Sequence, residues 1–533
     1  MSENEIQKPL VVKTDEGLSE LTDAGREAVA PFVTDTDAQV YGFTSEADSL
    51  MVAAAMARLS RNSNGARVIL ASEFIGKEDK DSALLKRVVT EFGDDSVMQL
   101  YPVQLVFEDI SNIATKAVER GRLAAYLEQS SRYLRFDQKD GNGNYRYLVP
   151  EELDAQTKEE YQVNVDDIFD IYSNLYVQVR THIEEASIEQ VHDAAWRNAC
   201  HAQACDSIRG ILPSATKATV GFEGSAQALY NLILKLESEP LPELQKLGRA
   251  ALAAVRQIAP VFFERADVPE RGQLISDNRR QTRSDSRELT SKLVEQFGDN
   301  VEQQTGTYVK LISSEGNENQ LIAKILSDSS QLSYVQIEPI VAGLTDEEKQ
   351  EVIDVYVGDR YNRRVKPGRA FEYPHYEFEI QCDYGAFRDI QRGRMVDGFE
   401  WQPLQPYLGH GRPTIIDQAG LAESYEKAFQ ISQDTYELLK ERGYDDQAQY
   451  ATLFGHNMRF THKINARSLV HSAELRTTPQ GHPSYRKVFQ DMVRLVEEVH
   501  PHITRVMRFM NQSENPELAR LGAERARQQR DAQ

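Results

Sequence analysis

An internal repeat is the feature that most constrains how this chain can fold. Each half passes in the same order through two helices, a breaker, a strand, a further helix and an Arg-Gly-Arg triplet. The predicted positions are 40–60, 79–92, 93–96, 100–107 and 103–118 in the first half, and 321–332, 345–356, 368, 373–380 and 387–391 in the second. The triplets are Arg120-Gly121-Arg122 and Arg392-Gly393-Arg394. A repeat of this length is a whole domain rather than a solenoid unit, so the sequence predicts two tandem copies of one domain.

The segment 118–133 gathers polar groups that suit an anionic, planar ligand. Residues 100–107 alternate well enough for a strand, whereas apolar residues at three- and four-residue steps over 103–118 predict a helix. Two arginines follow, and Ser130-Ser131-Arg132-Tyr133 comes ten residues after the first of them. Arginine binds phosphate bidentately and stacks on flat rings, so the segment is a candidate binding site. Solvated arginines at a helix end are the alternative interpretation.

Length and composition predict a two-domain globular protein. The chain has 533 residues, of which 40% are hydrophobic and 27% are charged, and this is long for a single core. We expect a loosely ordered arm over 1–37, domains over 38–268 and 310–512, a linker over 269–309 and a tail over 513–533. The linker is rich in arginine; a nucleic-acid patch is the alternative interpretation, weakened by the interleaved acidic residues.

Charge and hydropathy exclude several classes of partner. A net charge of −22 argues against broad nucleic-acid binding, which needs a basic surface. The sequence contains no run of the roughly 18 apolar residues that a membrane span needs, and residues 1–5 lack the features of a signal peptide. Three cysteines cannot form a disulfide framework, which indicates the reducing cytoplasm. Together, the charge, the hydropathy and the cysteine count predict a cytoplasmic protein that binds neither membrane nor nucleic acid.

A second polar pattern lies in the second half. The segment Asn465-Ala466-Arg467-Ser468-Leu469 is followed by His471 and Arg476. On a helix, Asn465, Ser468, Ser472 and Arg476 fall near one face. Such a stripe is either a solvated face or the wall of a ligand site.

Both segments resemble the flavin-dependent thymidylate synthases. The family signature is R-H-R-x-x-S-x-N-x-x-S-x-R, and Arg120, Arg122, Ser130 and Arg132 match it. Gly121, Ala125 and Leu127 replace the signature His, Ser and Asn. The family also carries Asn-Ala-Arg-Ser-Leu with an arginine eleven residues after the Asn, as Asn465 and Arg476 do here. The resemblance implies an α+β fold with two tandem copies of one domain, each a small, mostly antiparallel sheet with long flanking helices.

The resemblance also implies a reaction and its residues. The family methylates dUMP to dTMP, with FAD as cofactor and with NADPH and methylenetetrahydrofolate as co-substrates. By resemblance, the nucleotide would contact Arg120, Glu128, Gln129, Ser130, Ser131, Arg132, Arg209 and Arg476, of which Ser130 and Arg476 would be catalytic. The flavin would contact Ser96, Arg120, Arg122, Asn465, Arg467, His471, Arg392 and Arg394.

The two halves have lost different parts of the pattern. The first half has Gln227 where the second has Arg467, and the second has Gln449 where the first has Arg209. We therefore expect composite sites between the halves and a homodimer that forms a pseudo-tetramer. The alternative is a catalytically inactive relative that binds nucleotide or flavin, or only scaffolds an assembly, because three signature residues are replaced.

Histidines and cysteines give weaker signals. Cys200, His201 and Cys205, with His192 upstream, resemble a metal cluster, but no second Cys-x-x-Cys pair completes a tetrahedral site. Buried helical cysteines are the preferred interpretation, so no metal site is predicted. His456 and His462 precede the Asn465 helix and are either structural or part of a nucleotide pocket.

Overall fold

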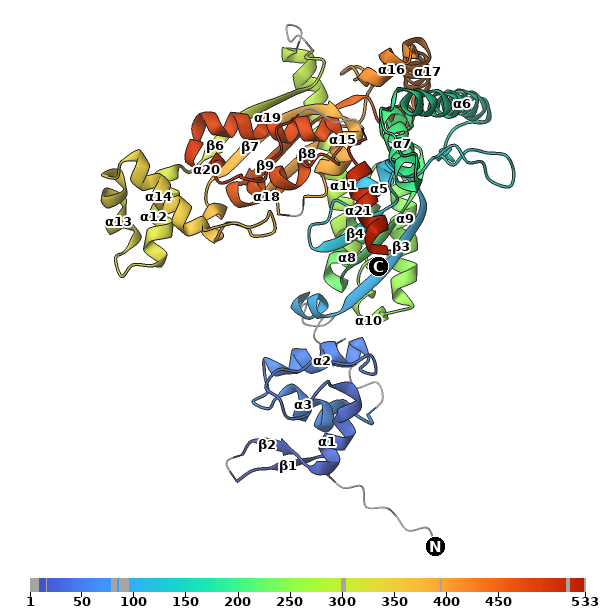
Figure 1. Ribbon diagram of the computed structural model, residues 1–533. Coiled ribbons are helices and arrows are strands. Elements are labelled where there is room, and N and C mark those ends of the chain that lie inside the picture. The colour runs from blue at the N-terminus through green and yellow to red at the C-terminus, as the bar shows by residue number, and fades with distance from the viewer. Residues whose placement is uncertain are drawn as a thin grey trace. The chain divides into compact units, whose positions relative to one another are not determined.

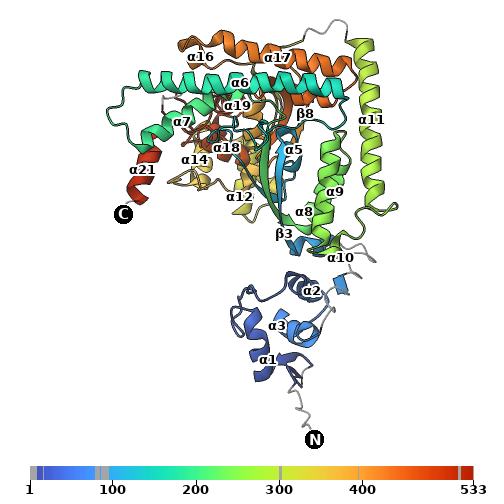
Figure 2. The same cartoon turned by 90° about the vertical axis from the view of Figure 1, so that its right-hand side faces the viewer.

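The structure is a computed structural model that describes residues 9–15, 17–77, 84–85, 95–298, 303–393, 395–513 and 518–531 (Figure 1 and Figure 2). Its contacts divide the chain into two units. Unit 1 comprises 1–108, 117–128 and 219–300, and unit 2 comprises 109–116, 129–218 and 301–533. Unit 2 therefore contains segments of both sequence halves. The domain boundaries expected near 268 and 310 remain predictions, because these units follow contacts rather than repeat order.

The first repeat contains a three-stranded sheet in the order β3-β5-β4. Its elements are α2 (Ser49–Leu59), α3 (Ala66–Ile69), the π-helical turn η2 (Leu70–Phe74), the 3₁₀ turn η4 (Asp95–Leu100), β3 (Pro102–Ser111), α5 (Asn112–Val118), β4 (Ala124–Glu128), α6 (Ala155–Ala186), α7 (Ala194–Ile208), the 3₁₀ turn η5 (Arg209–Ile211), β5 (Lys217–Ser225), α8 (Ala226–Glu237), α9 (Pro242–Arg256) and α10 (Pro260–Phe263). The helix expected over 79–92 lies almost wholly outside the described residues.

The second repeat contains a four-stranded antiparallel sheet in the order β6-β7-β9-β8. Its elements are β6 (Tyr308–Glu315), α12 (Glu318–Asp328), α13 (Tyr334–Ala342), α14 (Asp346–Val357), the 3₁₀ turn η6 (Arg369–Glu372), β7 (His375–Asp383), α15 (Tyr384–Ile390), β8 (Gly398–Trp401), α16 (Thr414–Gln418), α17 (Ala422–Glu441), the 3₁₀ turn η7 (Gln447–Ala451), β9 (Asn457–Asn465), α18 (Ala466–Arg476), α19 (Pro483–Val499) and α20 (Pro501–Thr504). The amphipathic helix α19 packs along β6 and β7 (Figure 1).

The two repeats share one topology, which confirms the predicted tandem copies and α+β fold. In each, a strand leads into a seven-residue helix, β3 into α5 and β7 into α15. In each, a nine-residue strand pairs with a shorter antiparallel one, β5 with β4 and β9 with β8. The long helices α6 and α17 also correspond, and they pack side by side in unit 2 (Figure 2).

The helix predicted over 103–118 is wrong for its first nine residues. Residues 102–111 form strand β3, as the alternation over 100–107 predicted, and α5 begins only at Asn112. Val103, Phe107 and Ile110 are buried. Asp109 has a φ of 52°, which breaks the strand alternation. The buried residues thus fall four and three apart, a spacing that imitates a helix.

Equivalent segments of the two repeats pair with each other inside unit 2. Pro213 and Leu453 occupy the same position in their repeats and form an antiparallel bridge. On one side the Phe454 N–H donates to the Leu212 carbonyl at 2.9 Å, and on the other the Ser214 N–H donates to the carbonyl of residue 452 at 2.7 Å. Like-to-like pairing of this kind is what a two-fold axis requires, so the fused copies retain a pseudo-two-fold contact.

His456 follows this paired segment and gives it a pH dependence. Its side chain is 4% exposed, and Nδ1 accepts a hydrogen bond from the Leu453 N–H at 2.9 Å. Burial, with a smaller effect of His410, lowers the pKa of His456 to about 3 from a usual 6.5. At a pH between these two pKa values, the His456 ring is protonated in the unfolded chain and neutral in the folded chain. Folding stability should therefore fall as pH drops from 6.5, by up to about 1.4 kcal/mol per pH unit for this residue.

The variant His456→Asn keeps an acceptor for the Leu453 N–H but cannot titrate. Urea unfolding at pH 7 and pH 5 should show a smaller loss of stability for this variant than for the parent chain. Equal losses in the two proteins would contradict the assignment of a buried, neutral His456.

The arm, the expected linker and the tail all contain regular structure. The arm holds β1 (Val11–Lys13), β2 (Ser19–Leu21), α1 (Asp23–Val29) and the 3₁₀ turn η1 (Ala30–Phe32), and Thr22 caps α1 through its side chain. The linker region holds α11 (Gly272–Phe297), and the tail holds α21 (Leu521–Asp531), which packs against α7. Within the described residues, no helix has the length and apolar character needed to cross a membrane.

Candidate functional site

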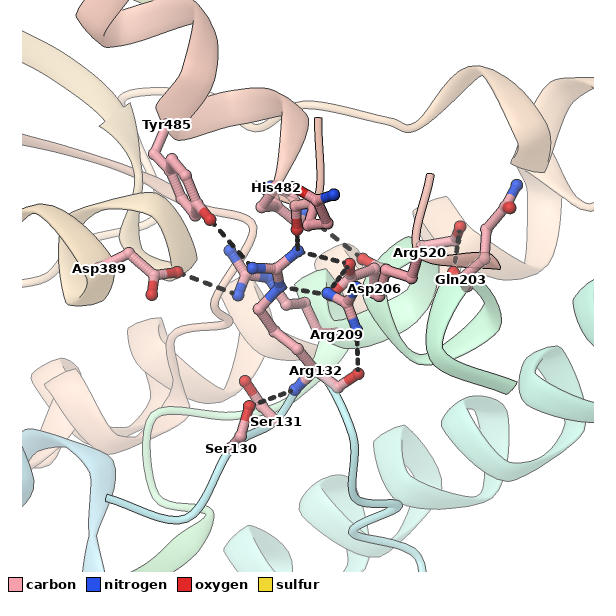
Figure 3. Close-up of polar contacts among 12 residues, drawn as sticks. Ser130, Ser131, Arg132, Gln203, Asp206, Arg209, Asp389, His482, Tyr485 and Arg520 are labelled. Atoms are coloured by element: carbon pink, nitrogen blue, oxygen red, sulfur yellow. Dashed lines mark hydrogen bonds and ion pairs between the residues drawn. The ribbon is translucent and has the colours of Figure 1, made fainter. Parts of the chain in front are cut away.

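A cluster of charged side chains in unit 2 draws on both repeats and on the tail (Figure 3). The first repeat contributes Ser130, Ser131, Arg132, Gln203, Asp206 and Arg209, the second Asp389, Arg476, His482 and Tyr485, and the tail Arg520. Of the two predicted segments, 120–132 and 465–476, unit 2 contains the whole of the second and only residues 129–132 of the first, because 120–128 belong to unit 1. We call this set the Arg209 cluster.

Arg132 is the most heavily bonded residue of the Arg209 cluster. Its Nε and Nη2 donate to the two carboxylate oxygens of Asp206 at 2.8 and 2.9 Å. Its Nη1 donates to the Tyr485 hydroxyl at 3.0 Å, and Nη2 also donates to the Gln480 carbonyl at 2.8 Å. Burial lowers the pKa of Arg132, but its hydrogen bonds to Asp206 and the charge of that carboxylate outweigh burial and raise it. Arg132 therefore serves chiefly to hold the 129–133 loop against the second repeat.

Asp206 connects Arg132 to the tail. It lies in the last turn of α7, a helix that Asp193 caps by accepting the Trp196 N–H. Its second oxygen also accepts from Arg520 Nη2 at 2.8 Å. Burial would raise the pKa of Asp206, but hydrogen bonding to Arg132 and the surrounding positive charge hold it below its usual range. The carboxylate is thus ionised and shared by two guanidiniums.

The variant Arg520→Ala tests whether the tail supports this arrangement. The side chains of Arg520 and Asp206 are only 10% and 17% exposed, so their bond is poorly screened by solvent. Its loss should cost about 1–3 kcal/mol of unfolding free energy. The exposed Arg530 of α21, the helix that follows Arg520, gives the matched control, Arg530→Ala, whose effect should stay within about 0.5 kcal/mol. Equal losses for both variants in urea unfolding would contradict the tail's role.

Arg209 presents the open edge of the cluster. Its side chain is 4% exposed, and Nη1 lies 3.4 Å from Asp389 Oδ2. Its Nε and Nη2 are buried and have no hydrogen-bond partner among the residues that the structure describes. These two nitrogens form the edge of a guanidinium that binds phosphate or carboxylate bidentately. A Cβ at Gly385 would lie 3.4 Å from both nitrogens and 3.0 Å from Oδ1 of Asp383, so this edge lies beside Gly385 with the Asp383 carboxylate nearby. Because buried unpaired N–H groups are costly, this edge is suited to an anion.

Asp389 lies between arginines of the two repeats. Its Oδ1 lies 4.0 Å from Nη1 of Arg476, which ends α18 and is 21% exposed. Burial would raise the pKa of Asp389, but the charges of Arg209 and Arg476, with smaller effects of other arginines, hold it well below its usual range. The Arg476 guanidinium also lies 5.7 Å from the centre of the Tyr485 ring. The carboxylate thus orients two arginines without neutralising both.

His482 contributes a neutral ring to the cluster. Its Nδ1 accepts the Ser484 N–H at 3.3 Å, which leaves the proton on Nε2, and Nε2 donates to the Asp206 carbonyl at 3.3 Å. Burial, reinforced by the charge of Arg209, lowers the pKa of His482 to about 3. It therefore adds a fixed hydrogen-bonding ring and no charge at neutral pH.

The predicted flavin-binding residues of the second repeat make structural contacts. Asn465 caps α18 by accepting the Ser468 N–H at 2.9 Å. Arg467 donates to the Pro367 carbonyl at 2.8 Å and to Glu372 at 3.1 Å, which ties α18 to η6. His471 differs, because its Nδ1 is buried without a hydrogen-bond partner. Burial and the charges of Lys366 and nearby arginines lower the pKa of His471.

The other predicted residues are spread over both units. In unit 1, Ser96 lies in η4, Arg120 and Arg122 lie between α5 and β4, and Glu128 ends β4. In unit 2, Gln129 and Ser130 begin the loop, and the Ser130 hydroxyl accepts the Arg132 N–H at 3.3 Å. Ser131 is buried and accepts from Arg388 at 3.1 Å. Arg392 is exposed after α15, and Arg394 lies outside the described residues.

The sequence prediction missed six members of the Arg209 cluster and the neighbouring Gly385; the six are Gln203, Asp206, Asp389, His482, Tyr485 and Arg520. Asp206 precedes Arg209 by three residues, which is one helical turn, and this spacing was a usable signal. Asp389 stands three residues before Arg392 in a chain with 83 acidic residues, so nothing local distinguished it.

The cysteines do not have the properties of nucleophiles. Cys200, Cys205 and Cys382 are all buried and free. Burial raises the thiol pKa of Cys200 to about 11 and that of Cys205 to about 12. A thiol at such a pKa is protonated at neutral pH and is a poor nucleophile and metal ligand. In the described part of the chain, no group of three or more His, Cys, Asp or Glu residues could hold a metal ion.

Comparison with known proteins identifies the family. A model of the thymidylate synthase complementing protein family matches residues 40–261 and 286–502, which is most of the chain in two successive segments. A UPF0159 protein of Chlamydia muridarum is 30% identical over 524 residues, covering 94% of this chain and 97% of that protein. A flavin-dependent thymidylate synthase of Clostridium tetani is 22% identical over 192 residues, covering 35% of this chain and 71% of that enzyme.

Among solved structures, a UMP/dUMP methylase PolB from Streptomyces cacaoi bound with 5-Br dUMP matches 40% of this chain and all of that chain. Its sequence identity is 15% and its TM-score is 0.31, which is too low to support an argument about this protein. The assignment instead depends on the double family match and on the shared topology of the two repeats. The chain belongs to the thymidylate synthase complementing protein family, as two copies of its domain in tandem.

Proposed function

We propose that this protein methylates dUMP to dTMP, with methylenetetrahydrofolate as carbon donor, FAD as cofactor and NADPH as reductant. One observation carries the proposal: the buried Nε and Nη2 of Arg209 have no hydrogen-bond partner in the described part of the chain. A nucleotide monophosphate supplies the dianion that this edge lacks, and membership of the family supplies the reaction class.

In this proposal the two repeats share the substrate. Arg209 binds the phosphate through its open edge. Arg132, fixed by Asp206 and Tyr485, positions the loop that carries Ser130, and the Ser130 hydroxyl contacts the nucleotide. Arg476 donates to the pyrimidine oxygen and stabilises the negative charge that develops on the ring during methyl transfer. Because no thiol nucleophile is required, the raised pKa values of the cysteines are compatible with the reaction.

The surroundings of His471 fit an anionic cofactor. Its buried Nδ1 lacks a hydrogen-bond partner within the described residues, and Lys366, Arg363 and Arg476 are among the charges that lower its pKa. We propose that this basic environment, with Arg467, holds the phosphates of FAD. FAD supplies hydride transfer when it is bound. The protein groups bind, orient and exclude water from the reacting ring.

A catalytically inactive, nucleotide-binding relative is the second candidate. It is favoured by one observation, the replacement of three signature residues by Gly121, Ala125 and Leu127. Such a protein would keep Arg209 as an anion site but would not turn over dUMP.

Complementation of a thymidine-requiring strain separates the two candidates. The proposal predicts growth without thymidine, FAD in the purified yellow protein, and release of tritium from dUMP labelled at C5. Arg476→Ala should abolish growth and tritium release while leaving FAD absorbance in place. A folded protein that binds dUMP but supports neither growth nor release would establish the inactive relative instead.

We also propose that two chains pair into a pseudo-tetramer of four domain copies. The like-to-like bridge at Pro213 and Leu453 supports this pairing, because fusion of two copies would make one two-fold contact internal to the chain. Sedimentation equilibrium should then give twice the chain mass of 60.5 kDa. A monomer at micromolar concentration would contradict the pairing.

A further inference from the structure

Strand register gives the correspondence between the repeats residue by residue. Glu128 pairs with Val220 at the end of β4, and Trp401 pairs with Phe460 at the end of β8. The central strands β5 and β9 each have nine residues and end at Ser225 and Asn465, a constant offset of 240. Position 220 therefore corresponds to 460, and position 128 to 401. The seven-residue helices α5 and α15 correspond at an offset of 272, from Asn112 to Tyr384.

Four charged members of the Arg209 cluster have neutral counterparts in the other repeat, whereas Asp206 corresponds to Asp446 and keeps its charge. By these offsets the counterparts of Arg132, Arg209, Asp389 and Arg476 are Gln405, Gln449, Ala117 and Leu236. None of the four counterparts carries a charge. Both repeats have lost charged residues at these positions, because Ala117 and Leu236 lie in the first repeat and Gln405 and Gln449 lie in the second.

Two of the neutral counterparts, Gln449 and Leu236, make structural contacts. Gln449 accepts the Leu404 N–H at 3.1 Å through Oε1 and donates to the Asp446 carbonyl at 3.1 Å through Nε2. Its own carbonyl accepts the hydroxyls of Ser214 and Thr452 at the pseudo-two-fold contact. Leu236 is fully buried in α8. These positions are therefore part of the packed and hydrogen-bonded framework.

We infer that each chain holds one nucleotide-phosphate site, where a symmetrical tandem repeat would hold two. The inference builds on the proposed function, because it takes dUMP as the ligand of the Arg209 edge. A phosphate dianion needs charge-assisted hydrogen bonds, and neutral glutamine, alanine and leucine side chains cannot supply them. One set of the symmetry-related positions thus kept charged binding residues, and the corresponding set now holds neutral residues of the framework.

Titration calorimetry of the full chain with dUMP tests this count. The expected stoichiometry is one dUMP per chain. The variant Arg209→Ala should raise Kd about 100-fold or more, whereas its counterpart Gln449→Ala should leave the stoichiometry at one and Kd within threefold. Gln405→Ala, at the counterpart of Arg132, provides a second control away from the Gln449 hydrogen bonds. Circular dichroism checks that each variant is folded.

Each outcome has a separate meaning. Two dUMP molecules per chain, or equal weakening by Arg209→Ala and Gln449→Ala, would overturn the single-site inference while leaving the proposed function in place. No detectable binding of dUMP by the folded chain would overturn the proposed function and, with it, this inference. Repeating the titration with inorganic phosphate should also give one site per chain, which Arg209→Ala removes.

Discussion

Replacing Arg209 by alanine should weaken dUMP binding by about 100-fold or more. The variant removes the two buried N–H groups that we assign to the phosphate. Hydrogen bonds to charged groups contribute about 1.5–3 kcal/mol each, so losing two corresponds to about 3–6 kcal/mol. The effect should appear in Kd measured by calorimetry, because these bonds form in the ground-state complex.

A graded series distinguishes phosphate binding from a loss of structure. Arg209→Lys keeps the charge beside Asp389 but lacks the forked edge, so its Kd should fall between those of the parent and Arg209→Ala. Thermal unfolding shows whether each variant is folded at the assay temperature. A folded Arg209→Ala protein that binds dUMP within threefold of the parent would remove Arg209 from the site.

Replacing Glu474 by alanine should destabilise the protein by about 3–5 kcal/mol. The side chains of Glu474 and Arg360 are both fully buried and form a bidentate pair, with 2.8 Å between Glu474 Oε1 and Arg360 Nη1. Removing one partner leaves an uncompensated buried charge, which is the costly way to break such a pair. Urea unfolding measures the loss. Glu474 precedes Arg476 by two residues on α18, so activity should fall as well.

The double variant Arg360→Met with Glu474→Leu provides the control. It removes both charges at once, so it should recover most of the stability that Glu474→Ala loses. The Val506 and Val365 carbonyls, which accept hydrogen bonds from Arg360, would lose that donor in the double variant but keep it in Glu474→Ala. If Glu474→Ala unfolds with the free energy of the parent chain, the pair is not a structural requirement.

The repeat and the strand–helix order were predictable because they depend on local pattern. The Arg-Gly-Arg triplet at Arg120 and its repetition at Arg392 were enough to predict two tandem copies. The resemblance to the flavin-dependent thymidylate synthases then predicted the small antiparallel sheet of each copy. The error over 103–118 had a local cause. One residue, Asp109, adopts a left-handed φ and shifts the strand alternation, and no apolar pattern reports such a shift.

The candidate site was predictable in part, because its arginines carry motifs and its carboxylates do not. Arg132, Arg209 and Arg476 were named from the sequence, and unit 2 contains all three in one cluster. Their division of work was not predictable. Arg132 is occupied by Asp206, and only three-dimensional contacts show that Arg209 keeps an open edge. Their roles in binding and catalysis remain proposals.

A crystal structure of the protein with dUMP bound most directly tests the claim that the two repeats share one nucleotide. The account predicts phosphate oxygens within hydrogen-bonding distance of Arg209 Nε and Nη2, with the pyrimidine ring against Arg476 of the second repeat. A nucleotide bound entirely by residues of one repeat, with the Arg209 edge unfilled, would contradict it.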